Sequence, residues 1–290
     1  MSNKKNFLLL ILFFISNSIN LVQAQTVNFH LPFSQTGTYQ AISKLVNAGL
    51  EEKGWKFDVK ITKNLVLSKQ AYETSKEPFI LAWSELSGTA KNEPSYLPPA
   101  DVKNFIGFTH FGAFYICTTK DIVADDLNKK KFKIGIPSST PAEVQFVKKF
   151  IKQTKTEHTA VYYENSTELA TGLFSGEIDL AVSSLGPRWV ANNQARCLLN
   201  TGKENLHGSV TMLSAFPDFS MNEFKTNLYY IGKNFTDDQL TRLRNDLNFV
   251  KANYKPYLDY IKNAQLDSYT DSLDNQLLYL KKIDQYWNNE

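Results

Sequence analysis

The chain has 290 residues, and its 32 basic and 29 acidic side chains leave a formal net charge of +3. This near-neutral balance excludes the concentrated basic surface that nucleic-acid binding requires. Aromatic residues make up 13% of the sequence, a content that suits large hydrophobic cores or an aromatic-lined cleft.

The N-terminus has the pattern of a secretory signal peptide. Lys4 and Lys5 precede an unbroken apolar run over residues 7–15, and Val22-Gln23-Ala24 forms a small-x-small exit. The run is shorter than the roughly 20 residues that span a bilayer. We therefore expect residues 1–24 to be removed after Ala24 and the mature protein to work in the periplasm. An uncleaved N-terminal anchor is the alternative.

The first part of the mature sequence alternates strand and helix patterns. Strands are predicted at 27–31, 57–61 and 78–83, with helices at 42–50 and 71–76 between them. After a loop-rich stretch, the apolar segment 105–119 holds either two strands or one long strand that passes between lobes. This rhythm is typical of a parallel sheet covered by helices.

The same rhythm then restarts. Strands are predicted at 131–136, 159–163, 178–182 and 197–199, with helices after residue 140 and at 167–174. A further strand at 227–231 precedes three helical patterns, the first of which opens with a capping box between Thr236 and Gln239 and runs to about Lys251. The others cover 254–262 and 272–287. Two successive α/β units joined by a crossover predict two similar lobes with a cleft.

Two loops rich in small hydroxyl residues follow strands in matching positions of the two units. Ligands in open α/β sheets bind at the carboxyl ends of strands, where helix N-termini hold anions. Ordinary helix capping is the alternative for either loop. Two further strand ends can line the same cleft, although Trp83 can equally be part of the core. The candidate ligand-binding residues are Ser34, Gln35, Thr36, Gly37, Thr38, Tyr39, Trp83, Ser84, Ser138, Ser139, Thr140 and Ser183.

Motifs for catalysis and metal binding are absent from the sequence. It contains no Gly-x-Ser-x-Gly elbow, no Walker loop and no dinucleotide-binding glycine fingerprint. None of the four histidines has metal-ligand spacing to another or to a cysteine. We therefore predict no catalytic residue, no metal and no cofactor. A secreted hydrolase with an unrecognised site is the alternative.

The two cysteines, Cys117 and Cys197, are an even pair in a chain with an export signal. In an oxidising compartment such a pair indicates one disulfide. Two isolated buried thiols are the alternative.

Several fragments occur in an order that is typical of one receptor family. They are residues 32–38 (PFSQTGT), 79–98, 134–139 (IGIPSS), 161–180 and 196–202. In these fragments the sequence resembles the extracytoplasmic solute receptors of the tripartite tricarboxylate transporters, over most of the mature length. Tyr39 and Ser183 stand where that family usually has Asp, so the resemblance does not identify a specific tricarboxylate as the ligand. Residues 37–39 are also similar to the TAXI-type receptors of TRAP transporters.

The resemblance implies a two-lobed α/β fold of the type II periplasmic-binding-protein class, in which each lobe has a mixed, mainly parallel sheet flanked by helices. Lobe 1 would comprise residues 25–114 and 224–290, and lobe 2 residues 115–223. The crossover strand with Cys117 would lie beside the strand with Cys197, which makes a disulfide geometrically possible.

The resemblance also implies a function. A monomer would capture a small organic carboxylate and deliver it to the membrane subunits of a tripartite secondary transporter. Two alternatives use the same lobes: a ligand-sensing protein that reports to a partner receptor, and a TRAP/TAXI-type receptor that delivers to a different membrane partner.

Overall fold

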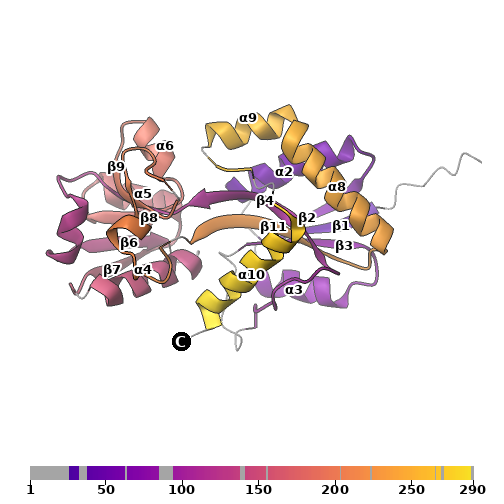
Figure 1. Ribbon diagram of the computed structural model, residues 1–290, viewed down its shortest axis with the longest axis horizontal. Helices are drawn as coiled ribbons and strands as arrows, with labels where there is room; N and C mark the ends of the chain where they lie inside the picture. Colours follow the sequence, from indigo (N-terminus) through magenta and orange to yellow (C-terminus); the bar gives the residue numbers. More distant parts are fainter. Residues whose placement is uncertain are drawn as a thin grey trace, which may run out of the picture.

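A computed structural model describes residues 26–32, 38–62, 64–84, 94–137, 141–154, 156–202, 204–222, 224–264, 266–268 and 271–288. The predicted signal peptide, residues 1–24, lies outside this part. Two sheets, one of five strands and one of six, lie side by side and are flanked by helices (Figure 1). Within the described part, no helix has the length and apolar character that crossing a membrane requires.

The first sheet has the strand order β2-β1-β3-β11-β4. β1, β2 and β3 are parallel, whereas β11 runs antiparallel to both β3 and β4. The strands are β1 (Thr26–Leu31), β2 (Lys56–Ile61), β3 (Phe79–Trp83), β4 (Phe105–Ala113) and β11 (Lys225–Lys233). Their helices are α2 (Thr38–Glu51), α3 (Leu65–Thr74), α8 (Asp237–Asn253), α9 (Lys255–Asn263) and α10 (Leu273–Asn288).

Helices cover both faces of this sheet, as Figure 1 shows. Ile80 and Ala82 of β3 pack in a core with α2, α8 and α9, while Phe79, Leu81 and Trp83 pack on the opposite face with α3 and α10. Successive side chains of a strand point to opposite faces, so a strand covered on both sides needs an unbroken apolar sequence. This accounts for the run FILAW in β3.

The second sheet has the order β10-β9-β5-β8-β6-β7. β6, β7 and β8 are parallel, and β5 runs antiparallel to β8 and β9. The strands are β5 (Tyr115–Thr118), β6 (Lys133–Pro137), β7 (Thr159–Tyr163), β8 (Leu180–Ser183), β9 (Arg196–Asn200) and β10 (Val210–Thr211). Its helices are η2 (Ala124–Asn128, a 3-10 helix), α4 (Pro141–Thr154), α5 (Ser166–Phe174), α6 (Gly186–Ala191) and α7 (Met212–Ala215).

The structure refines the predicted bounds of two segments. The apolar segment 105–119 holds two strands, which separate at Phe114. Helix α3 begins at Leu65 rather than near residue 71, because the Asn64 side chain accepts a hydrogen bond from the Leu67 N–H at 3.0 Å and caps the helix. Phe114 is the point where the chain passes from one sheet to the other. The residue boundaries of the two lobes stay a prediction.

A β-bulge in β4 is held by side chains from three helices. The β4–β11 register shifts twice between Leu228 and Ile231. Lys251 of α8 donates to the Phe108 carbonyl at 3.0 Å, Tyr257 of α9 donates to the Thr109 carbonyl, and the Gln276 side-chain oxygen of α10 accepts from the Phe108 N–H at 3.1 Å. Buried backbone groups that leave the ladder need such partners.

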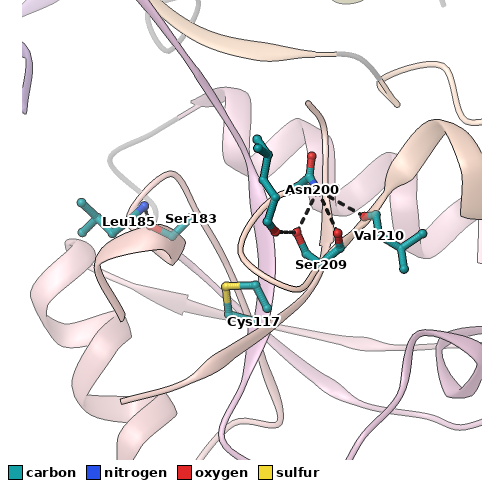
Figure 2. Close-up of a disulfide and its surroundings, with 8 residues drawn as sticks. Cys117, Ser183, Leu185, Asn200, Ser209 and Val210 are labelled. Atoms are coloured by element: carbon teal, nitrogen blue, oxygen red, sulfur yellow. Dashed lines mark hydrogen bonds between the residues drawn. A yellow bond between two sulfur atoms is a disulfide. The ribbon is translucent and has the colours of Figure 1, made fainter. Parts of the chain in front are cut away.

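Cys117 of β5 and Cys197 of β9 form a disulfide between directly paired residues, with Cα atoms 3.9 Å apart. Helix α6 packs against it, since a Cβ atom at Gly186 would lie 2.9 Å from Cys117 Sγ. Figure 2 shows this bridge beneath the turn of Ser183 and Leu185. The pairing that the resemblance implied is therefore present in the structure.

Removal of the disulfide by the double substitution Cys117→Ala and Cys197→Ala should lower the free energy of unfolding by about 2–4 kcal/mol, because the bridge constrains a long loop of the unfolded chain. Denaturant titration measures the loss. Added reductant should destabilise the wild type and leave the double variant unchanged. Two titratable thiols in unreduced, unfolded protein would contradict the assignment.

Lys251 should make stability rise with pH above neutrality. Burial lowers the pKa of its ammonium to about 8, below its ordinary value of 10.5. The unfolded chain therefore binds more protons at Lys251 between these values, and the contribution of this group to the free energy of unfolding should increase by ~1.5 kcal/mol from pH 8 to 9.5. Lys251→Met should remove this increase, as measured by urea titration at both pH values. Equal pH slopes in the two proteins would contradict the prediction.

Candidate ligand-binding site

The parallel strands of the first sheet end at one common edge. His30 of β1 pairs with both Lys60 and Leu81, so β1, β2 and β3 finish side by side. β11 and β4 continue past this edge to the pair Lys225 and Ala113. The carboxyl ends of β1 and β3 therefore point toward the second sheet (Figure 1).

The second sheet has the reciprocal arrangement. Ile134 of β6 pairs with Leu180 of β8, so both strands end at one edge. Ser183, the last residue of β8, pairs with Tyr115, the first residue of β5. Since Tyr115 directly follows the connection from β4, this edge faces the first sheet. The carboxyl ends of the parallel strands in both units therefore face each other across the connecting strands.

Most of the predicted loop residues lie outside the described residues. These are Ser34, Gln35, Thr36 and Gly37 after β1, and Ser138, Ser139 and Thr140 after β6. The flanking elements are described: α2 begins at Thr38, and α4 begins at Pro141. The two loops therefore connect the facing strand ends to helix N-termini, and their contacts stay predictions.

Thr38 and Tyr39 form the first turn of α2 and are half-buried. The ring of Tyr39 lies against the ring of His110 on β4, with the centroids 5.5 Å apart. This contact joins the start of α2 to the strand that leads to the second sheet. The sequence analysis placed Tyr39 in the candidate site but gave no role to His110.

Trp83 is a core residue in this structure. Only 3% of its surface is exposed, and it belongs to the cluster that β3, β4, α3 and α10 enclose. Ser84, which follows it, is also buried. Trp83 was interpreted either as a residue that lines the cleft or as a core residue, and the geometry favours the core.

Ser183 is buried, and its hydroxyl accepts a hydrogen bond from the Leu185 N–H at 3.1 Å (Figure 2). Such a local bond stabilises the turn that leads into α6. Ser183 thus has a structural partner at the strand end where the sequence analysis predicted a ligand contact.

Asn200, at the carboxyl end of β9, is a residue that the sequence analysis missed. It is fully buried and holds the loop that follows. Its Nδ2 donates to Ser209 Oγ at 2.8 Å (Figure 2). Its Oδ1 accepts from the Gly202 N–H at 2.7 Å. The next residue, Thr201, bonds both backbone groups of Phe114, at 2.9 and 3.0 Å. The connection between the sheets is thereby held from the second sheet. A single Asn at a strand end gives no signal for this role.

Neutral groups dominate the described part of the site. Thr38, Tyr39 and Ser183 carry no formal charge. Burial, with a smaller contribution from the charge of Asp267, raises the pKa of Tyr115 to about 12, so this phenol also stays neutral. Among the described residues, no group of three or more His, Cys, Asp or Glu side chains is placed to hold a metal ion. Hydroxyl and backbone N–H groups can bind an anion without a counter-charge.

Comparison with solved structures identifies the fold. Adipate-bound Rpa4515 from R. palustris superposes with a TM-score of 0.72 at 15% identity, covering 90% of this chain and 94% of that one. Malate-bound MatC from Rhodopseudomonas palustris gives 0.69 at 8% identity, covering 91% and 98%. The chain has the fold of the type II periplasmic binding proteins. The predicted fold class is therefore confirmed.

A third structure, the periplasmic binding protein BugD, gives a TM-score of 0.66 at 14% identity and covers 90% of this chain and 93% of BugD. No protein-family model matches the sequence, and no curated protein matches it. The similarity is therefore one of fold, and it covers nearly the whole length of each neighbour.

Trp83→Ala should destabilise the protein by about 3–5 kcal/mol, because it leaves a large cavity in a closed core. Trp83→Phe should lose much less, since it refills most of that volume. Both variants, when folded, should retain the wild-type affinity for any ligand, as measured by calorimetry. Loss of binding with unchanged stability would instead indicate that Trp83 contacts the ligand.

Proposed function

We propose that this protein is an extracytoplasmic solute-binding receptor of the tripartite tricarboxylate transporter type. It captures a small organic carboxylate between its two lobes and delivers it to membrane transport subunits. It is not an enzyme: the fold neighbours include a periplasmic binding protein and a TctC solute-binding protein.

Two observations carry the proposal. The fold matches proteins that hold adipate and malate over at least 90% of both chains, and the strand ends of the two sheets face each other as the ligand-binding ends of open α/β sheets do. The loops at these ends, residues 33–37 and 138–140, are rich in hydroxyl groups and precede α2 and α4. Helix N-termini of this kind favour a carboxylate.

The delivery role sets further expectations. The chain is exported by its signal peptide, which is removed after Ala24, and acts in the periplasm as a monomer. Its lobes divide at residues 114–115 and 223–224. A ligand held by both loops makes contacts that exist only when the lobes are closed, so binding shifts the protein toward the closed state.

A panel of small carboxylates should raise the melting temperature of the mature protein, residues 25–290, whereas sugars should not. A ligand that binds only the folded state adds about 2.7 kcal/mol at a concentration of 100 times its Kd. Thermal unfolding with succinate, malate, adipate, citrate and glucose measures this effect. Stabilisation by a sugar alone, or by no member of the panel, would contradict the carboxylate assignment.

A pair of proline variants tests the second loop. Ser139→Pro removes a backbone N–H from the predicted site and should abolish the carboxylate shift. Ser166→Pro is the matched control: it lies at the first residue of α5, which follows β7 in the same sheet, and proline is tolerated there. Equal ligand shifts in the two variants would exclude the loop from the site.

Uptake measurements separate transport from the alternatives. Deletion of the gene should abolish import of the bound carboxylate if the protein feeds a tripartite transporter. Unchanged import with a lost transcriptional response would favour a ligand sensor. Dependence of import on a TRAP-type permease would favour a TAXI-type receptor.

A further inference from the structure

His110 is a fully buried histidine beside the candidate site. It lies on β4 opposite Leu228 of β11, and the adjacent Tyr229 pairs with Trp83 at the carboxyl end of β3. Its ring contacts Tyr39 in the first turn of α2. His110 therefore sits level with the strand ends that face the second sheet, under the helix that follows the β1 loop.

The hydrogen bonds around His110 fix its tautomer. Thr109 Oγ1 lies 3.0 Å from the Leu228 carbonyl oxygen and 3.0 Å from His110 Nδ1. A carbonyl can only accept, so the single hydroxyl proton of Thr109 goes to Leu228. The hydroxyl oxygen then accepts from the His110 ring, which places the proton on Nδ1. Nε2 is left as an acceptor with an unprotonated lone pair.

No described residue uses this acceptor. His110 Nε2 is buried and has no hydrogen-bond partner among the described residues. Burial lowers the pKa of the ring to about 3, so it stays neutral at physiological pH and does not act as a cation toward a carboxylate. A buried acceptor without a donor is costly, which favours a role for it in binding.

We propose that His110 Nε2 accepts a hydrogen bond from the bound ligand, and that the ligand is a small carboxylate that also carries a hydroxyl or amino donor. The inference rests on the proposed receptor function and specifies the chemistry of its ligand. The ring of Tyr39, which is half-buried, turns aside to admit the donor to Nε2. His110 thus binds a second polar group of the ligand, separate from its carboxylate.

Matched acids test the proposal. Calorimetry on the mature protein compares succinate with malate and aspartate, and glutarate with 2-hydroxyglutarate and glutamate. Within at least one series, the hydroxy or amino acid should bind about tenfold more tightly than the unsubstituted acid, the factor expected for one hydrogen bond. Malate and aspartate separate a hydroxyl preference from an amino preference.

His110→Phe should reduce that ratio to about one and leave the affinity for the unsubstituted acid unchanged, because phenylalanine keeps a ring against Tyr39 but has no acceptor. His30→Phe is the matched control. His30 is also buried, and its Nδ1 likewise has no hydrogen-bond partner among the described residues. Its ring, however, contacts Phe79 in the core on the opposite face of the sheet, so the ratio should persist.

Nitrogen-15 NMR of the histidine rings gives a readout that needs no variant. His110 should show the Nδ1–H tautomer in the free protein, and its Nε2 resonance should move on addition of the preferred acid. An Nε2–H tautomer, or equal affinities within both series for a protein that does bind carboxylates, overturns this proposal alone. Failure of every acid to bind overturns the receptor function as well.

Discussion

The antiparallel ladder between β4 and β11 is the interaction on which the rest of the structure depends. It extends the first sheet past the ends of β1 and β3, and β4 leads directly through Phe114 into β5 of the second sheet. Because of this extension, the carboxyl ends of the parallel strands of the two sheets face each other. Thr201 bonds both backbone groups of Phe114, so the link between the sheets is fixed from the second sheet.

A bulge interrupts this ladder within buried β4, and polar side chains bond the backbone groups that leave the ladder. The carbonyl groups of Phe108 and Thr109 are bonded by side chains from α8 and α9. Bulges of this kind re-aim side chains next to functional sites. Here the side chain that follows the bulge is His110, whose ring is turned toward Tyr39 and α2. The bulge whose Phe108 carbonyl is bonded by the buried Lys251 thus also positions His110, the candidate recognition group.

Much of the fold was predictable because its strands follow local rules. Strands covered on both faces have continuous apolar sequences, as in β3, and the capping box of Thr236 and Gln239 marks the start of α8. The start of α3 was missed because an apolar period alone did not show that Asn64 caps the helix. The short β10 and α7 have too few residues to form a recognisable period.

The site was less predictable, because its described contacts join residues far apart in sequence. Trp83 and Ser183 stand at strand ends, where ligands bind, but one packs in the core and the other caps a turn. Whether a strand-end residue faces a ligand depends on the register of its neighbours. The role of His110 depends on a pairing with Leu228 and on the proton of Thr109, neither of which a linear pattern contains.

The chemistry of these residues sets how the site can discriminate. Tyr39 and Ser183 are neutral where the receptors that the sequence resembles usually have Asp. Hydroxyl groups can bind an anion without adding a counter-charge. A neutral site gains little selectivity from net charge. It gains selectivity when a buried polar atom must be matched, because a ligand without the matching group leaves that atom unpaired. A neutral acceptor such as His110 Nε2 is matched by a donor and repelled by a second carboxylate oxygen. Selection by hydrogen-bond pattern is therefore the form of specificity that this arrangement supports.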